Sequence, residues 1–392
     1  MAEINPVLPA PIDADPNCDE EIKHGIACDD MFRRSDPVYN FIRYTTHVGP
    51  IIGYLLFGLI PFITETIYCS LAGCLVAEPP TIGLWQDYSN FVNLALLFPT
   101  LFAFYLWIPR AITSSFAALR KNKVIPPFQS LEYAPLYERI HKLFSHWLWF
   151  LAALIITLLL EFVLVVPYTR NFNNWWSQVD FFFIGHQVYF IVIMYSMVYL
   201  ILRILQFILA LRWMFKTITV DLKALHPDGC GGLRTLGDFS MKLGYGIGII
   251  GFSIVVLFFQ VNVNLGGELW QIDWSIPIIT VFVAYLLFAP VVFFAPLSTA
   301  HEAMRKAKEE ELLIISQHFE KNYKNILVEL PTLQGRLKEG IDTIKQMQEL
   351  YDVVARFPVW PYDNRNLVRF FSSVGTPVLI TLISTLINWI IR

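Results

Sequence analysis

Six long apolar segments, separated by polar stretches, dominate the pattern of this chain. A helix needs about 20 apolar residues to cross the hydrocarbon core of a bilayer, and within lipid it satisfies its own backbone groups. The segments run approximately from Val48 to Leu71, Phe91 to Ile112, Trp147 to Pro167, Phe183 to Leu205, Leu243 to Val263 and Ile276 to Leu297. The pattern therefore predicts an all-α protein, a polytopic transmembrane helix bundle.

A seventh apolar stretch, Val374 to Ile391, is barely long enough to cross a bilayer. It can span the membrane, dip into it and return, or pack against the bundle, so we predict six or seven spans. The chain then divides into four parts. These are a cytoplasmic N-terminal segment (1–46), a six-helix bundle (47–298), a cytoplasmic helical hairpin (299–366) and the C-terminal apolar segment (367–392).

Positive charge in the connecting loops predicts the orientation. Loops on one side, such as Ala72 to Asn90, contain almost no Lys or Arg, whereas the opposite side carries nearly all of the basic residues. Basic residues gather on the cytoplasmic side of membrane proteins. We therefore expect a multi-pass protein of the plasma membrane, or of the inner membrane in a bacterium, with its N-terminus in the cytoplasm.

The region after the sixth span has the pattern of two amphipathic helices. Apolar residues recur at intervals of three and four, first at Leu312, Ile315, Phe319, Tyr323 and Ile326, and again at Leu333, Leu337, Ile341, Ile344, Met347 and Tyr351. Pro331 separates the two stripes, and this spacing predicts a helical hairpin. The stripes either pack only on each other or also pack against the hairpins of other subunits.

Composition excludes several classes of protein. The chain has 392 residues, is 55% hydrophobic and 16% charged, and carries a formal net charge of −3, so nothing indicates attraction to nucleic acid. The five cysteines include no C-x-x-C pair, and we expect neither a metal nor a cofactor. Cys69 and Cys74, at the outer end of the first span, can form a disulfide if that helix ends by about Leu71.

Five ionisable side chains fall within the apolar segments, where burial of charge is costly and points to function. Counted along the spans, Glu65, Glu161 and His186 form an outer layer, and Arg110 and Arg203 lie near the inner boundary. The glutamates either belong to a polar cation path or are hydrogen-bonded to neighbouring helices. For the arginines we favour side chains that reach out to the lipid head groups over a gating role.

The most distinctive loop has the sequence His-Pro-Asp-Gly-Cys-Gly-Gly-Leu. Its candidate ligand-binding residues are His226, Asp228, Gly229, Gly231 and Gly232. The backbone N–H groups of closely spaced glycines can bind an anion such as a phosphate. The alternative, which we favour, is a Pro-Asp-Gly turn, in which proline fixes φ and glycine supplies positive φ.

Other motifs do not indicate an enzyme. The segment Gly246-Ile-Gly248-Ile-Ile-Gly251 imitates a dinucleotide-binding motif, but it lies inside the fifth span with no strand before it. Gly244 and Gly248 are better interpreted as a face for close helix packing. The catalytic signatures G-x-S-x-G and H-E-x-x-H are missing from the sequence, and we do not expect an enzyme.

Two motifs together resemble a group of little-characterised bacterial multi-pass membrane proteins. They are His226-Pro-Asp-x-x-Gly-Gly-Leu233 and Phe357-Pro-Val-Trp-Pro-Tyr-Asp363, followed by the final apolar segment. The resemblance covers roughly residues 210–392. Some membrane proteins of this build are effectors in bacterial anti-phage systems, where an opened pore depolarises the cell. The resemblance implies such a role and carries no site residues with it.

These features favour a gated ion-conducting membrane protein, a channel or pore-forming effector, assembled as a homo-oligomer in the lipid bilayer. We expect its cytoplasmic helices to receive an activating ligand or protein. Two alternatives stay open. One is an ion-coupled small-molecule transporter that uses Glu65 and Glu161, and the other is a non-conducting membrane receptor or scaffold.

Overall fold

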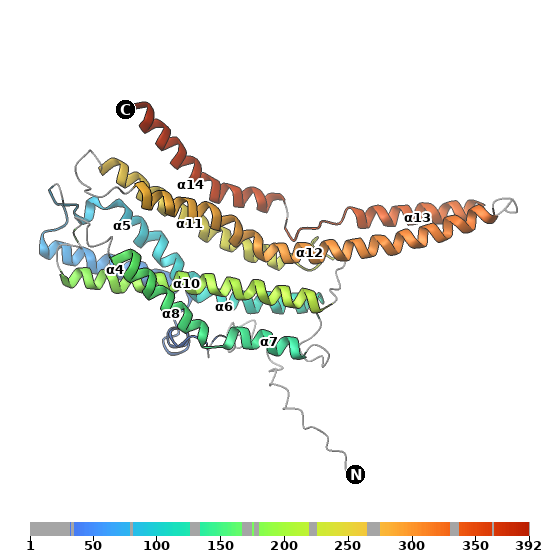
Figure 1. Cartoon of the computed structure of the whole chain (residues 1–392), viewed down its shortest axis with the longest axis horizontal. Helices are drawn as coiled ribbons and strands as arrows, with labels where there is room; N and C mark the ends of the chain where they lie inside the picture. The colour runs from blue at the N-terminus through green and yellow to red at the C-terminus, as the bar shows by residue number, and fades with distance from the viewer. Residues whose placement is uncertain are drawn as a thin grey trace, which may run out of the picture.

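The protein is an elongated bundle of helices, from which one pair of helices projects at one end (Figure 1). The computed structural model describes residues 32, 35–78, 81–125, 134–166, 175, 180–218, 226–264, 275–329, 337–362 and 364–391. Within these residues all regular secondary structure is helical, with no strand. We call the projecting end the hairpin end, and the opposite end, where Cys69 and Cys74 form a disulfide bond, the disulfide end. The predicted all-α bundle is confirmed.

The main helices follow one another along the chain with short connections. They are α3 (Pro37–Asn40), α4 (Pro50–Ala72), α5 (Tyr88–Val92), α6 (Phe98–Lys121), α7 (Ala134–Ser145), α8 (Leu148–Leu160), α10 (Asp180–Thr217), α11 (Arg234–Asn264), α12 (Ser275–Glu329), α13 (Leu337–Ala355) and α14 (Asn364–Ile391). Short π-helical segments cover Phe41–Thr45, Asn93–Leu97 and Glu161–Val165. In the centre of the bundle α10 packs on α6, α8 and α12, and α11 packs on α6, α12 and α14.

Six helical stretches among the described residues are long and apolar enough to cross a membrane. They are Pro50–Ala72, Tyr88–Lys121, Pro135–Val163, Phe183–Thr217, Arg234–Val256 and Tyr285–Leu327. Each overlaps one of the six predicted segments. The chain is therefore a multi-pass helical membrane protein.

Several helices extend well beyond the predicted spans. The 38 residues of α10 make a helix of about 57 Å, whereas the hydrocarbon core is about 30 Å thick. Its last turns, at the hairpin end, carry Arg212 and Lys216. The apolar pattern marks only the part of a helix that lies in lipid, whereas the backbone hydrogen bonds continue until Thr217.

Two glycines, which have no side chain, let α4 approach α6 closely. A Cβ atom on Gly53 would lie 2.8 Å from Leu106, and one on Gly58 would lie 2.9 Å from Pro99. These distances are shorter than van der Waals contact, so larger residues at either position would push the helices apart. Most of the remaining surface of α4 exposes apolar side chains, as expected for a helix in contact with lipid.

The glycines of α11 face different neighbours. A Cβ atom on Gly244 would lie 3.1 Å from Phe370, and one on Gly248 would lie 3.0 Å from the backbone oxygen of Ser373, both on α14. A Cβ atom on Gly246 would lie 3.0 Å from Phe104 on α6. Gly244 and Gly248 therefore form a face for close helix packing, as the sequence predicts.

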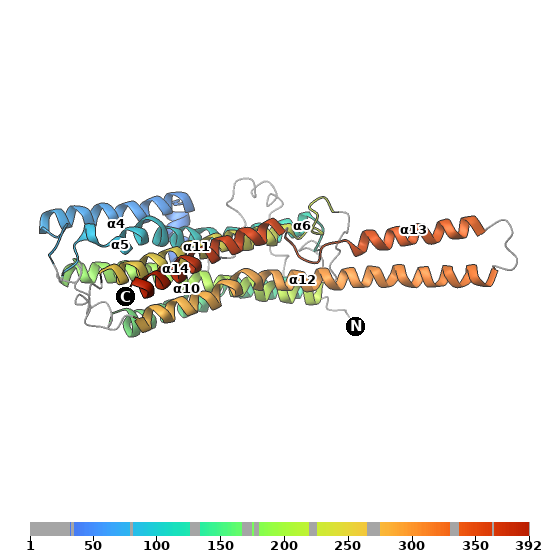
Figure 2. The same ribbon diagram turned by 90° about the horizontal axis from the view of Figure 1, so that it is seen from above.

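The projecting hairpin consists of the far half of α12 and the whole of α13 (Figure 2). α12 runs as one helix of 55 residues from the membrane bundle to the tip. The two helices are antiparallel, because Ile326 lies 3.1 Å from the Cβ position of Gly340 and the amide of Asn322 donates to the sulfur of Met347 at 3.5 Å.

The predicted apolar stripes of the hairpin are only partly correct. Tyr323, Ile341 and Tyr351 are exposed by 46%, 42% and 42%. Two helices bury a narrow seam, whereas a stripe counted at intervals of three and four is wider than that seam. Residues at its margins therefore face outward. Pro331 and Leu333 lie outside the described residues.

α14 is a single helix from Asn364 to Ile391, with Pro377 inside it. It starts near the base of the hairpin and runs along α11 toward the disulfide end (Figure 1). A segment that dips into the membrane and returns would reverse direction, which α14 does not do. A seventh crossing by this helix stays a prediction.

Candidate functional site

A buried carboxylate joins the N-terminal segment to the bundle. Oδ1 of Asp36 accepts hydrogen bonds from the backbone N–H groups of Val38 (2.9 Å) and Tyr39 (3.1 Å), which begins α3. Oδ2 accepts from the hydroxyls of Tyr105 on α6 (2.8 Å) and Tyr195 on α10 (2.9 Å). Four donors on two oxygens meet the full demand of an ionised carboxylate. Asp36 thereby ties α3 to two membrane helices.

A buried arginine makes the second link to the same segment. One terminal nitrogen of Arg203 donates to the backbone oxygen of Phe144 on α7 (3.0 Å) and to Oε1 of Gln206 (2.7 Å). The other donates to the hydroxyl of Ser35 (2.5 Å). The guanidinium thus holds together α7, α10 and the N-terminal segment. We call Ser35, Asp36, Tyr105, Tyr195, Arg203 and Gln206 the Asp36–Arg203 network.

Aromatic rings and opposite charge compensate for the burial of this network. The guanidinium carbon of Arg203 lies 4.6 Å from the ring centre of Tyr199 and 4.9 Å from that of Phe32, distances at which a cation is attracted to a ring face. Burial raises the pKa of Asp36 above its ordinary 3.8, while the hydrogen bonds from tyrosines and the charge of Arg203 oppose that rise.

The expectation that Arg203 reaches out to lipid head groups is wrong, because the side chain is only 1% exposed. Besides Gln206 and Tyr199 on its own helix, it contacts α7 and residues before the first span, and no local pattern around Arg203 reveals these distant partners. Arg110, the other predicted arginine, is half-buried on α6. Asp36 was missed, although one signal was readable: an aspartate followed by Pro37 is a typical helix start.

The three predicted outer-layer residues lie in separate environments. The carboxylate of Glu65 on α4 accepts a hydrogen bond from the amide of Asn90 on α5 (2.9 Å), which is the hydrogen-bonded alternative for this residue. The ring of His186 lies 4.9 Å from that of Phe190. Glu161 is fully buried, and neither carboxylate oxygen has a hydrogen-bond partner among the described residues. Among the residues that the structure describes, no chain of hydrogen bonds therefore joins the two glutamates.

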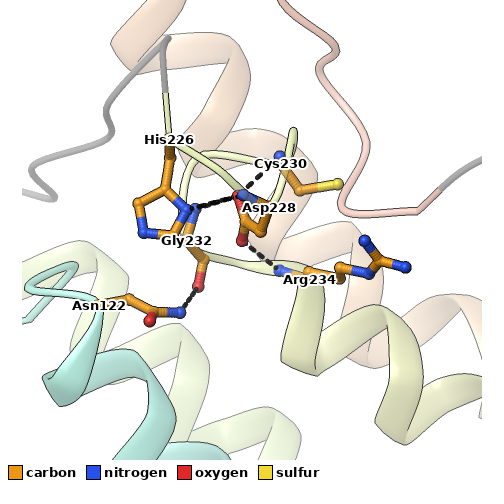
Figure 3. A network of polar contacts seen from close by, with 6 residues as sticks. All are labelled: Asn122, His226, Asp228, Cys230, Gly232 and Arg234. Atoms are coloured by element: carbon orange, nitrogen blue, oxygen red, sulfur yellow. Dashed lines mark hydrogen bonds and ion pairs between the residues drawn. The ribbon is translucent and has the colours of Figure 1, made fainter.

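The loop His226–Leu233 is organised around its own aspartate (Figure 3). Oδ1 of Asp228 accepts from the backbone N–H groups of Cys230 (2.9 Å) and Gly232 (3.0 Å), and Oδ2 accepts from that of Arg234 (3.3 Å). Nδ1 of His226 lies 2.7 Å from Oδ1. The carboxylate therefore occupies the N–H groups that an external anion would need, which favours the turn interpretation.

Backbone conformation and charge both fit this turn. Gly229, Gly231 and Gly232 have φ values of 67°, 63° and 91°, a region that residues with a Cβ atom avoid. Burial of Asp228 tends to raise its pKa, but the three backbone donors and His226 outweigh it and leave the pKa below 3.8. The side chain of Asn122, just after α6, donates to the backbone oxygen of Gly232 (2.9 Å) and anchors the loop to the bundle.

The second motif meets α11 and α12 at the base of the hairpin. We call Phe357–Tyr362 the elbow, because it connects α13 to α14. The elbow fits against α11 only because residue 237 is glycine, since a Cβ atom there would overlap the backbone oxygen of Pro361. The ring of His301 on α12 stacks on Trp360 with centres 4.0 Å apart, and its Nδ1 lies 2.7 Å from the backbone oxygen of Val359.

Lys308 fastens the hairpin to the elbow. Its ammonium group donates to the backbone oxygens of Ala355 (2.5 Å), the last residue of α13, and of Phe357 (2.9 Å). A cation at a helix C-terminus satisfies unpaired carbonyls and interacts favourably with the helix dipole.

Below the elbow, the rings of Phe293 on α12 and Phe370 on α14 stack with their centres 3.8 Å apart. One continuous set of contacts therefore joins α12, α13 and α14.

At the disulfide end, Cys69 and Cys74 are bonded to each other, with Cα atoms 4.6 Å apart. α4 ends at Ala72, and Gly73 with a φ of 73° turns the chain back. Among the residues that the structure describes, no three His, Cys, Asp or Glu side chains group together as metal ligands would. Asp363 of the elbow motif lies outside those residues.

Comparison with known proteins gives no further assignment. No family model matches the chain, and no curated protein or solved structure matches it. The class of protein is therefore defined by its own helices: a multi-pass helical membrane protein with a projecting helical hairpin.

Proposed function

We propose that this protein is a gated ion-conducting membrane protein, a channel or pore-forming effector, that works as a homo-oligomer and is controlled through its hairpin. The observation that carries the proposal is the bond of Lys308 to the end of α13 and to the elbow. Through this bond the hairpin is attached to α12 and, by way of the elbow, to α14. We propose a conducting protein rather than an enzyme.

Movement of the hairpin has a defined route into the membrane. Its outgoing helix, α12, is itself a span, so a tilt at the tip acts directly on that span. Its returning helix, α13, reaches α14 through the elbow, which is held on one side by His301 and on the other by the backbone at Gly237. α14 in turn packs along α11. Packed elements of this kind shift between discrete arrangements, which is what gating needs.

An ion pathway is proposed between copies of the chain. Inside one copy, aromatic side chains fill the space between α6 and α10: the ring of Tyr105 lies 4.9 Å from that of Tyr199 and 5.9 Å from that of Tyr195. Packing of this density leaves no room for a column of water. Closed rotational symmetry is the common arrangement of membrane and soluble homo-oligomers, and its axis provides a route.

Reconstitution in liposomes tests the proposal. The intact protein is incorporated into vesicles with a potassium gradient, a potential-sensitive dye reports ion flow, and protein-free vesicles serve as the control. We expect a dye signal from vesicles in which mass measurement finds an oligomer. A monomer that carries no ions would overturn the proposal.

The orientation belongs to the same proposal: a plasma-membrane protein with its N-terminus and hairpin in the cytoplasm. The bond between Cys69 and Cys74 supports it, because disulfides persist on the oxidising side of a membrane and this one lies at the end opposite the hairpin. A membrane-impermeant maleimide tests it. Lys306→Cys on the hairpin, in a chain whose Cys18 and Cys28 are serine, should react only after the cells are permeabilised. Reaction in intact cells would reverse the orientation.

A non-conducting receptor or scaffold is the second candidate, because the hairpin offers apolar side chains to the surroundings. Exposed examples are Leu313, Ile314, Leu327, Leu350 and Val353. This candidate predicts a soluble protein or a ligand that binds the hairpin, and no ion flow through the intact chain. Loss of binding on deletion of Thr299–Arg356, with no dye signal from the full-length protein, would favour it over a channel.

A place in anti-phage defence is proposed from the resemblance of the two motifs alone. If it is correct, cells that carry the intact chain depolarise on phage infection. Equal phage yields from cells with and without the chain, over a panel of phages, would remove this part of the proposal.

A further inference from the structure

Glu161 lies within the third span, close to the end of its apolar helix at Val163, and has no hydrogen-bond partner among the described residues. It follows α8 and begins the π-helical segment Glu161–Val165, about 20 Å along the helix from Leu148. Its side chain is 0% exposed, and neither carboxylate oxygen has a hydrogen-bond partner among the described residues. Thr157 is equally buried, and its hydroxyl also lacks a partner in that part of the chain.

Thr157 and Glu161 share one face of the helix, because residues four apart are neighbours on a helix surface. Together they place three buried oxygen atoms within about one helical turn of an otherwise apolar stretch. The helix changes from α to π at Glu161, and π-helical turns are rare features that often mark functional sites. Phe162 and Val163 next to it are exposed, so this turn of the helix has one buried and one exposed side.

Among the described residues, no charged group lies close enough to Glu161 to offset the cost of burying its carboxylate. The helix that faces this segment is α10, and its titratable side chains along the membrane have other contacts. The ring of His186 contacts Phe190, the hydroxyl of Tyr189 donates to the backbone of Phe57, Tyr195 donates to Asp36, and Arg203 donates to Ser35 and lies over Tyr199. The side chains of Arg170 and Asp180 lie outside the described residues.

An ionised carboxylate without donors is strongly disfavoured in a medium of low dielectric constant. A bound proton removes the charge and turns one acceptor oxygen into a donor. The hydroxyl of Thr157, one turn away, is an acceptor of the right kind for that O–H group. A hard metal cation takes six or more oxygen ligands in its sites, so these three oxygens are too few for one. The chemistry of the site therefore matches a proton.

We propose that Glu161 is a membrane-embedded proton-binding site, held as the neutral acid around neutral pH. The two side chains share no hydrogen bond in the structure, and in the protonated form the O–H group of Glu161 turns toward the hydroxyl of Thr157. The proposal goes beyond ion conduction and does not depend on it, because a non-conducting receptor could bind the same proton.

Labelling with dicyclohexylcarbodiimide tests the site, because this apolar reagent enters lipid and reacts with protonated carboxyl groups. The full-length protein in liposomes is treated around neutral pH, and the labelled residues are mapped by mass spectrometry. Glu302, an exposed glutamate on α12, is the internal control. We expect strong labelling of Glu161 that declines as the pH rises, and weak labelling of Glu302. Equal or weaker labelling of Glu161 would overturn the proposal.

Three variants and one exchange of salt distinguish a bound proton from an ion pair and from a bound sodium ion. Glu161→Gln, which imitates the neutral acid, should keep the size-exclusion profile of the unaltered protein, and a loss of folding would show that the charge is required. Thr157→Val should move the decline of labelling to lower pH. Arg170→Gln should change nothing, and labelling that appears only in this variant would identify an ion pair instead. Protection from the reagent by sodium chloride but not by choline chloride would identify a sodium site and contradict the proposal.

Discussion

The guanidinium of Arg203 donates a hydrogen bond of 2.5 Å to the hydroxyl of Ser35, 168 positions earlier in the chain. This bond fixes the segment before the first span against α7 and α10. It also places a positive charge near the buried carboxylate of Asp36, whose pKa it helps to lower against the effect of burial. The described residues just before the first span, Ser35 to Thr46, are thus a structural part of the bundle.

Replacement of Arg203 should release this segment. Arg203→Met leaves Ser35, Gln206 and the backbone oxygen of Phe144 without their donor, and breaking a buried charged network costs about 3–5 kcal/mol. We expect a loss of that order in thermal unfolding in detergent, together with faster hydrogen exchange around Ser35. Arg212→Met, an exposed position on the same helix, is the control. Equal effects of the two variants would contradict the role of the network.

The stability of the protein should carry a pH dependence that originates from Asp36. Its pKa in the folded state is raised above 3.8, so the folded protein holds this proton more tightly than the unfolded chain does. The carboxyl group therefore stabilises the fold most at low pH, and that contribution is lost as pH rises from about 3.8 through the folded-state pKa. Asp36→Asn should remove this slope from the free energy of unfolding measured across acid pH. An unchanged slope would assign it to other groups.

Gly237 should be intolerant of even one methyl group. Gly237→Ala places a Cβ atom where the backbone oxygen of Pro361 lies, and the backbone cannot move aside as a side chain can. We expect a loss of roughly 2–4 kcal/mol, in the range of severe overpacking, and release of the elbow, measured as increased proteolysis at Phe357–Tyr362. Gly185→Ala on α10, where a Cβ atom meets nothing within 4 Å, should be neutral or slightly stabilising. A neutral Gly237→Ala would show that the elbow is not held there.

The loop around Asp228 should lose stability in acid. Its pKa is lowered below 3.8, so its contribution is present above about 3.8 and is lost as pH falls through the folded-state pKa. Asp228→Asn keeps one acceptor oxygen and loses the charge, and we expect it to cost about 1–3 kcal/mol at neutral pH. Asp238→Asn, an exposed position on α11, serves as control. If both variants unfold alike, the turn is held by its glycines alone.

The fold could be predicted from the sequence where one local pattern decides the outcome. The first span was placed at Val48–Leu71 and is Pro50–Ala72, because a long, predominantly apolar run ended by glycine has few alternatives. The hairpin was predicted from helical periodicity, yet which margin residues face the seam depends on the crossing of two helices. Tyr323 and Ile341 face outward for that reason.

The candidate site could be predicted only in part. The glycines and the aspartate that form the turn lie within the His226–Leu233 loop itself, so the turn could be predicted from that stretch of sequence alone. Two of the partners of Arg203 are not local, since Ser35 and Phe144 come from other elements. The same is true of His301 and Trp360, which meet across the elbow. A single sequence gives the cost of burying a charge, but it does not reveal which distant group compensates it.

We propose that the bond between Lys308 and the elbow holds the ion-conducting assembly in its resting state. Lys308→Met removes the donor to the oxygens of Ala355 and Phe357. Lys306→Met changes a neighbouring, 78% exposed lysine on the same helix. Ion flow through liposomes that contain equal amounts of each variant is the most direct measurement. We expect Lys308→Met to conduct several-fold more than Lys306→Met and the unaltered chain. Equal flow from all three, or none from any of them, would contradict it.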